Sequence, residues 1–378
     1  MSAGDFPPEI LVEVLHRLPV KSLVKFTSVS KAWNSLITNQ TFIFDHLNRT
    51  IQASNGNGSL FLQLHHQTIE CSDPYFDHHE EFYSLDSDNQ QIDHFSVERF
   101  PLSRLIVWGR STVVGSCDGL ICVFDSSLCH SDTLIIWNPS IRKYMVLPEP
   151  IVTCMTGNNP LLFGFGFDSR NKDYKVIRIF PQVEVYSLAS RSWKNITNRA
   201  PPFLHCKPPQ KTTQVFVNGV VHWVVCRRCN GQIQNFILTF DVVEEMFGEL
   251  MLPPHLREST SVLSVLEGGK YLSVLHSHSE ANQGCFRIWI MREYGVVETW
   301  SELFCFDSDH YRNNILDVLA LASNGKVVLS LRKGTIVLFD PTTELLNPLG
   351  DGKHFRAFIG SYVQSLVLIK EEPHFLSY

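Results

Sequence analysis

The sequence predicts two regions of different fold class, a small helical module followed by a β-propeller that fills the rest of the chain. Three observations predict this. The first fifty residues place apolar side chains at helical spacing. Beyond residue 57 the apolar period changes from about 3.6 residues to 2, which is typical of strands. A repeat of about 50 residues then runs toward the C-terminus, and this length fits one four-stranded, kelch-like propeller blade.

Composition limits the classes of protein that fit the chain. The sequence has 378 residues, of which 44% are hydrophobic, so a disordered or fibrous protein is excluded. A net charge of −6 supplies no basic field for nucleic acid or an anionic membrane, and no run approaches the ~20 apolar residues of a membrane span. We find no signal peptide, and the ten cysteines are scattered, as expected for reduced thiols. We therefore expect a soluble protein of the cytoplasm and/or nucleus that binds neither nucleic acid nor membrane.

The N-terminal fifty residues predict three helices and a further apolar segment. Pro8 suits a first helical turn, and Pro19 ends that helix. A second short helix contains Leu23, and Ser30 can cap a third that contains Trp33. These helices total about 40 residues, too few to bury so many large apolar groups among themselves. The surplus predicts either a partner surface or docking on the chain's own C-terminal domain, and spacing alone does not decide between them.

This region resembles the F-box of plant F-box proteins. The matching residues are 6–26, beginning Phe6-Pro7-Pro8-Glu9-Ile10, and 29–37, which read Val-Ser-Lys-Ala-Trp-Asn-Ser-Leu-Ile. The sequence departs from the family pattern mildly, at Phe6, where Leu is usual, and at Ser30, where Cys is common.

The resemblance implies docking rather than chemistry. In the family these helices bind a Skp-type adaptor, and through it the cullin and RING subunits of a ubiquitin ligase. Some members of the implied set must instead form the core of the module, and Trp33 fits either role. The implied adaptor-binding residues are Pro7, Ile10, Leu11, Val14, Leu15, Leu18, Pro19, Leu23, Val24, Val29, Trp33, Leu36 and Ile37.

The propeller repeat is marked by an aromatic residue near the end of a short alternating run. Successive aromatics are separated by 54, 49, 54, 49 and 50 residues, and a second large side chain returns seven residues later in four units. Turn sequences such as Asp118-Gly119 and Asn218-Gly219 predict a hairpin before each aromatic run. In the fifth unit the second large side chain comes later in the sequence than seven residues after the aromatic, at Trp300. The aromatics are Tyr83, Trp137, Tyr186, Phe240, Trp289 and Phe339.

Counting these units predicts six blades, or seven if a divergent blade lies within residues 66–110. An irregular pair of β-sandwiches is the alternative. The first unit begins at Ser59 without an outer pair of strands, and a lone alternating strand, Tyr362–Ile369, is left over at the end. We therefore expect the two ends of the chain to close the ring together. The domains predicted are an F-box at 1–47, a linker at 48–57 and the propeller at 58–378.

The propeller region resembles the F-box-associated domain of plant F-box proteins. The resemblance rests on Gly115–Cys122, on Trp137–Tyr144, and on Gly164–Asp168 with Asp173–Val176. In that family this domain captures a target protein, and the target varies between members. Loops at one end of the ring are the candidates for this role, namely 66–81, 125–133, 199–211 and 226–234. Arg227 and Arg228 fit either an acidic target or plain surface.

Metal and catalytic sites are weakly indicated. His205, Cys206, His222, Cys226 and Cys229 contain one Cys-x2-Cys, whereas a structural zinc site usually shows two paired ligand clusters. Gly164-x-Gly166 lacks the third glycine and the helix that a dinucleotide needs. We predict no metal and no cofactor.

Two functions from different classes follow. In the first, the chain is the non-catalytic substrate-recognition subunit of an SCF (Skp–cullin–F-box) ubiquitin ligase, and it recruits a target protein for ubiquitination and degradation. In the second, it is a propeller enzyme or a metal-binding protein with an incidental helical extension. Residues 1–50 hold five basic and four acidic groups, so the −6 of the chain resides in the ring and the helical module must dock mainly through apolar surface.

Overall fold

The computed structural model describes most of the chain, with gaps between its segments. The described residues are 7–53, 59–67, 78–85, 92–94, 111–125, 133–152, 162–179, 182–201, 214–229, 231–266, 271–280, 283–306, 314–322, 324–332, 335–349 and 354–370. None of the helices in these ranges combines the length and the hydropathy that crossing a bilayer requires.

Four helices form the N-terminal module, and three of their boundaries follow from local chemistry. Pro8 occupies the first turn of α1, where a missing N–H costs nothing, and Pro19 precedes α2. The Ser30 hydroxyl accepts a hydrogen bond of 3.2 Å from the Trp33 backbone N–H, which confirms the predicted cap of α3. The fourth helix continues through residues 48–53 of the predicted linker. The helices are α1 (Pro8–His16), α2 (Val20–Phe26), α3 (Lys31–Ile37) and α4 (Gln40–Ala53).

The remaining described residues form six four-stranded antiparallel sheets, one for each repeat unit, and the predicted propeller class is confirmed. Blade 1 contains β24 (His354–Tyr362), β1 (Ser59–Gln67), β2 (His78–Leu85) and β3 (Ile92–His94). Blade 2 contains β4 (Ser111–Cys117), β5 (Leu120–Asp125), β6 (Thr133–Asn138) and β7 (Lys143–Val146). Blade 3 contains β8 (Leu162–Asp168), β9 (Asp173–Ile179), β10 (Val183–Ser187) and β11 (Ser192–Asn195).

The other three sheets follow in chain order. Blade 4 contains β12 (Val215–Val217), β13 (Val220–Cys229), β14 (Gln232–Asp241) and β15 (Met246–Leu250). Blade 5 contains β16 (Val262–Leu266), β17 (Leu272–Glu280), β18 (Gln283–Met291) and β19 (Trp300–Phe306). Blade 6 contains β20 (Ile315–Leu321), β21 (Val327–Leu331), β22 (Ile336–Asp340) and β23 (Leu345–Pro348). A short helix, α5 (Pro254–Arg257), connects blades 4 and 5.

The spacing of the repeat has a direct structural cause. Each marker aromatic lies on the third strand of its blade, and in four blades the residue seven positions later lies opposite it on the fourth strand. The cross-strand pairs are Trp137 with Tyr144, Tyr186 with Trp193, Phe240 with Phe247, and Phe339 with Leu346. In blade 1, Tyr83 instead lies opposite His94. In blade 5 a bulge shifts the register, so Trp300 pairs with Met291 and Trp289 with Glu302.

The first and last strands of the propeller region pair and close the ring, as predicted, but the last strand differs from the one expected. β24 ends at Tyr362 and pairs with β1 of blade 1, where its Gly360 lies opposite Phe61. The predicted strand Tyr362–Ile369 is therefore wrong. Ser365, Leu366, Val367 and Leu368 are consecutively buried, so these residues cannot alternate as a half-buried strand does.

Close packing of neighbouring blades explains the glycines of the first strands. A Cβ atom on Gly164 would lie 2.5 Å from Cζ2 of Trp223, and one on Gly166 would lie 2.7 Å from the Phe216 ring. Blade 4 thus packs against the backbone of β8, which confirms that Gly164-x-Gly166 is a strand feature.

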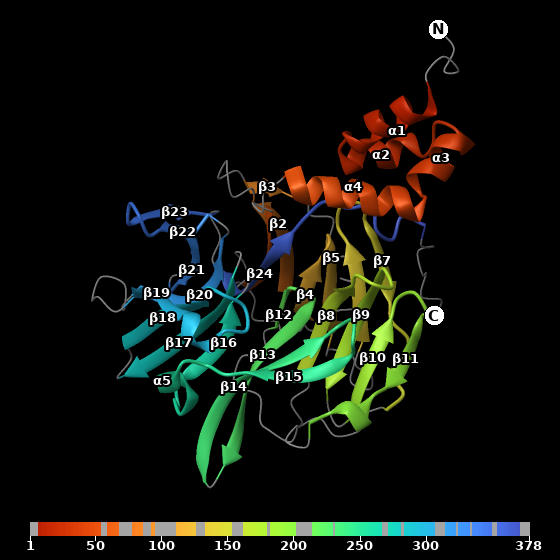
Figure 1. Cartoon of the computed structure of the whole chain (residues 1–378). Helices are drawn as coiled ribbons and strands as arrows, with labels where there is room; N and C mark the ends of the chain where they lie inside the picture. The colour runs from red at the N-terminus through yellow and green to blue at the C-terminus, as the bar shows by residue number, and fades with distance from the viewer. Residues whose placement is uncertain are drawn as a thin grey trace.

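The N-terminal module sits on one end of the ring. Figure 1 shows α4 lying across that end, with α1, α2 and α3 on the far side of α4 from the blades. The Phe44 ring of α4 lies 5.6 Å from the Phe167 ring of β8, and the Lys172 ammonium lies 5.9 Å from the centre of the same Phe44 ring. Leu47 of α4 is buried in a core that it shares with blades 2 and 3.

Candidate functional site

The surface of α1, α2 and α3 is the candidate site, because most residues of the predicted adaptor-binding set remain accessible there. Ile10 and Val14, one turn apart on α1, are each 50% exposed, and Val29 in the α2–α3 turn is 61% exposed. Pro7 and Pro19 are exposed as well. These residues place apolar side chains in water on a folded module.

Five further members of the set are half-buried. Trp33 packs edge-on against Phe26, with the ring centres 5.2 Å apart, and keeps part of its surface accessible. Trp33 therefore contributes both to the packing of the module and to its surface, and its contact with an adaptor stays a prediction. The other four half-buried members are Leu11, Leu18, Val24 and Leu36.

Three members of the set belong to the interior of the module. Leu15, Leu23 and Ile37 are each 0% exposed, and they pack in one cluster with Phe42 and Leu47. Leu15 follows Val14 in the sequence but points about 100° away from it around α1, which is enough to bury Leu15 and leave Val14 half exposed. These three residues hold the helices together and cannot contact a partner without unfolding.

The Glu13 carboxylate links α1 to α4 through an ion pair on the surface of the module. The Glu13 carboxylate accepts from Arg17 at 3.1 Å and from Arg49 at 2.8 Å. The hydrogen bonds from Arg49 and then Arg17 hold the pKa of Glu13 below its usual value. Behind this pair, burial lowers the pKa of His16, whose ring stacks on Phe42 at 4.3 Å.

Inside the ring, two buried ion-pair systems support blade 3. Arg178 Nη1 donates to Glu184 at 2.8 Å and to the Val152 carbonyl at 2.9 Å, and both charged side chains are almost fully buried. Lys175 lies 2.9 Å from Asp168 and 3.1 Å from Glu245 of blade 4. Burial opposes the charge of Asp168, but hydrogen bonds from Lys175 and Asn171 outweigh it and hold its pKa below the usual value.

Of the residues weighed for zinc, only Cys226 and His222 have described side chains. Both lie on β13, and Cys229 is the last residue of the same strand. His222 is buried, and its Nε2 lies 2.8 Å from the Tyr294 hydroxyl. His205 and Cys206 lie outside the described residues. Within the described ranges, no cluster of three or more His, Cys, Asp or Glu side chains could hold a metal ion.

The predicted target-binding loops 66–81, 125–133 and 199–211 fall largely outside the described residues. The fourth, 226–234, proves to be mainly strand, because β13 runs to Cys229 and β14 begins at Gln232. Arg227 is engaged within the blade: it donates to Glu249 at 3.0 Å and covers the Phe236 ring at 4.7 Å. Arg228 is exposed.

The sequence allowed the helical module to dock on the ring but did not indicate which residues make the contact. Phe44 and Phe167 meet although they are distant in the sequence, and nothing in either segment marks the other. The apolar run at 366–368 was a usable signal, but its alternating neighbours made it look like a strand.

Comparison with known proteins agrees with this architecture. Residues 4–45 match the model of the F-box domain, and residues 78–369 match the model of the F-box associated beta propeller domain. Among Arabidopsis thaliana relatives, F-box protein At3g07870 is 24% identical over 89% of this chain and 85% of its own length. F-box protein CPR1 is 27% identical over 92% and 84%, and F-box/kelch-repeat protein At3g23880 is 25% identical over 80% and 79%.

A solved structure of TolB from Acinetobacter baumannii is 10% identical, with a TM-score of 0.46, and covers 85% of this chain and 72% of that one. This likeness is too weak to bear on function. The two domain matches together span most of the sequence, and both agree with the helices and blades described above. The chain belongs to the plant F-box proteins that carry an F-box associated β-propeller domain.

Proposed function

We propose that this protein is the substrate-recognition subunit of an SCF ubiquitin ligase. Its F-box binds a Skp-type adaptor, and through it cullin and RING subunits, while its propeller holds a target protein. The observation that carries the proposal is an F-box whose apolar residues remain exposed on a folded module, with Ile10 and Val14 at 50% and Val29 at 61%. Exposed apolar groups clustered on one small module are typical of a protein interface.

The contact between module and ring supports this choice over docking on the chain's own domain. The module meets the ring through α4, with Phe44 against Phe167 and Leu47 in the shared core. Ile10, Val14 and Val29 are not used in that contact. The apolar surplus that the sequence showed is therefore still available after the chain has folded.

The proposed receptor performs no chemistry itself. Holding a target beside the ligase raises the local concentration of the lysine that reacts, so the propeller contributes binding and geometry. The net charge of the ring, −7 from 27 basic and 34 acidic groups outside residues 1–50, does not favour a strongly acidic target. A location in the cytoplasm and/or nucleus remains a prediction that accompanies this function.

The experiment compares three full-length variants for co-purification with a Skp-type adaptor. Ile10→Asp and Val14→Asp place a charge on the exposed apolar surface, and each should weaken binding at least about tenfold. Ile51→Asp is the matched control, because Ile51 is an equally apolar helical residue, 40% exposed, outside the predicted set. Full-length variants are preferable to deletion of residues 1–47, which would cut α4 and remove buried Leu47 from the shared core.

The proposal predicts adaptor binding by the wild type and the control, and loss of binding by the two other variants. A wild-type chain that does not bind adaptor, or three variants with equal affinity, would contradict it.

A further inference from the structure

The chain beyond β24 is irregular but buried. Ser365 and Leu366 are 0% exposed, and Val367 and Leu368 are each 7% exposed. Leu368 adopts a left-handed backbone with φ +71°, a conformation that costs energy for a residue with a branched side chain. A segment without strand partners holds such a conformation only when its surroundings impose it.

One side chain supplies most of the polar contacts that hold this segment. Asn138 at the end of β6 is 0% exposed, and its Nδ2 donates to three oxygens of the segment. These are the Ser365 carbonyl at 3.0 Å, the Ser365 hydroxyl at 3.2 Å and the Val367 carbonyl at 2.8 Å. Lys143 Nζ, on the next strand, donates to the Ile369 carbonyl at 2.5 Å. Blade 2 thus binds the segment through its third and fourth strands.

The repeat shows why asparagine stands at position 138. The equivalent residues after the marker aromatic are Ser187, Asp241 and Asp340 in blades 3, 4 and 6. In all four blades a side-chain oxygen at this position accepts a hydrogen bond from a backbone N–H of the following turn. Capping the turn therefore needs only an acceptor. The amide of Asn138 adds an N–H donor, and that donor faces the C-terminal segment.

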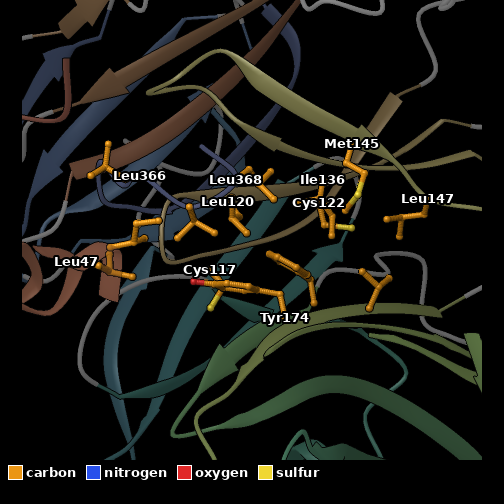
Figure 2. Close-up of a cluster of buried hydrophobic side chains, with 14 of the residues drawn as sticks. Leu47, Cys117, Leu120, Cys122, Ile136, Met145, Leu147, Tyr174, Leu366 and Leu368 are labelled. Carbon is orange, nitrogen blue, oxygen red and sulfur yellow. The ribbon is translucent and has the colours of Figure 1, made fainter. Parts of the chain in front are cut away.

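The apolar side of the segment lies between the F-box and the ring. Leu366, Val367 and Leu368 share one core with Leu47 of α4 and Leu120 of β5. Figure 2 shows Leu47 and Leu366 at the left of the cluster, and Leu120 and Leu368 between them and Cys122 and Ile136 of blade 2. The segment also passes over the β4–β5 turn, where a Cβ on Gly119 would lie 2.2 Å from the Val363 carbonyl oxygen.

From this arrangement we propose that residues 363–369 act as a clasp, which fixes the F-box on the ring, and that the Asn138 amide is the group that positions it. Two consecutive segments near the C-terminal end of the described chain then have different structural roles. Residues 354–362 close the ring by pairing with β1, and the clasp fills the space between blade 2 and α4. The clasp concerns contacts within the chain, so it does not depend on the proposed function. The consequence of the clasp does rest on the proposed function: in a receptor whose F-box is fixed on the ring, the bound adaptor and the bound target are held at a fixed separation.

The test is an exchange of asparagine and aspartate at two equivalent positions. Asn138→Asp keeps the oxygen that caps the turn but directs a carboxylate oxygen at two carbonyl oxygens of the clasp, those of Ser365 and Val367, which cannot donate to it. Asp340→Asn is the matched control, because Asp340 caps the equivalent turn of blade 6 at 2.9 Å through the Thr342 N–H. Hydrogen exchange followed by mass spectrometry reads the clasp, α4 and the blade strands separately in the full chain.

We expect Asn138→Asp to accelerate exchange in residues 363–369 and in α4 roughly tenfold or more, while blades 4 to 6 keep their protection. The control should match the wild type in the clasp and in α4. Unchanged exchange in α4 with a released clasp would overturn the proposal, since the segment would then not hold the F-box. Uniform loss of protection in every blade would assign Asn138 to general stability and would also overturn it.

A pair of truncations gives an independent readout. Removal of residues 363–378 deletes the clasp and keeps β24, whereas removal of 371–378 keeps both. We expect faster α4 exchange in the first truncation alone, and equal α4 exchange in the two would contradict the clasp. Adaptor affinity of the wild type separates this result from the proposed function. A wild type that binds adaptor, with a loosened α4 in the first truncation, supports both proposals, whereas a wild type that does not bind adaptor removes only the receptor.

Discussion

The F-box and the ring differ in how their apolar residues are distributed between core and surface. The ring buries its aromatics in pairs across neighbouring strands and between blades, as Trp223 does at 0% exposure against Gly164. The F-box leaves Ile10, Val14 and Val29 at least half exposed, although its interior holds fully buried Leu15 and Leu23. The described part of the ring also exposes apolar side chains, among them Ile151 at 61%, Leu345 at 60% and Met246 at 53%, but these belong to different parts of the ring. The F-box gathers its exposed apolar groups on one small module, which supports the proposal that another molecule binds there.

The largest effect expected is on the ring alone. Glu184→Ala leaves the buried guanidinium of Arg178 without the carboxylate that lies 2.8 Å away, and should cost about 3–5 kcal/mol of unfolding free energy. Chemical denaturation monitored by tryptophan fluorescence measures the loss. Adaptor affinity of the folded fraction should be unchanged. A variant as stable as the wild type would show that blade 3 does not depend on this pair.

The second prediction separates two neighbours on α1. Leu15→Ala removes a fully buried side chain and should destabilise the F-box by about 2–5 kcal/mol. Val14→Ala, at a half-exposed position, should change its stability by less than about 0.5 kcal/mol and yet weaken adaptor binding. Hydrogen exchange in α1 reports stability, and calorimetry reports affinity. Equal destabilisation by both variants would contradict the division of α1 into an inner and an outer face.

A pH dependence is expected from the ring. Burial lowers the pKa of His222 from 6.5 to about 4, so only the unfolded chain binds a proton there between these values. The contribution of His222 to ring stability should therefore be full above about pH 6.5 and fall by about 3 kcal/mol as the pH drops to 4.

The measurement is the unfolding free energy against pH for the wild type and His222→Gln. The substitution should flatten the profile in part, because burial also lowers the pKa of His276 to about 4 and leaves its contribution in place. A profile that His222→Gln does not alter would show that this histidine is not buried in its neutral form.

The smallest effect tests the packing between blades. Gly164→Ala inserts a methyl group 2.5 Å from Trp223 and should cost about 1–3 kcal/mol. Gly248→Ala is the control, since its Cβ would approach only the Thr239 hydroxyl, at 2.8 Å. Thermal denaturation compares the two. A larger loss at Gly248 than at Gly164 would contradict the account of the first-strand glycines.

The repeat made the ring predictable because its signals are local. An aromatic and a large residue seven positions later lie opposite each other across a short hairpin. The spacing of Phe240 and Phe247 in the sequence therefore predicts that they pair. The helices of the F-box were predictable for the same reason, through Pro8, Pro19 and the cap at Ser30.

Contacts between distant segments could not be predicted in this way. Residues 354–362 and 362–369 both alternate, and only the pairing with β1 shows which of them is the strand. The role of Asn138 depends on oxygens more than 220 positions away, and without them the residue resembles any turn-capping side chain. Within the predicted site, helical spacing alone could not separate buried Leu15 from exposed Val14, because both lie on the apolar stripe.

The central claim is that the exposed face of the F-box binds a Skp-type adaptor through apolar contact. Titration calorimetry of the full chain with adaptor, at several temperatures and salt concentrations, tests it most directly. The account predicts binding with a negative heat-capacity change and little dependence on salt, both reduced or lost in Val14→Asp and kept in Ile51→Asp. No binding, or binding that weakens steeply with salt and is indifferent to Val14→Asp, would contradict it.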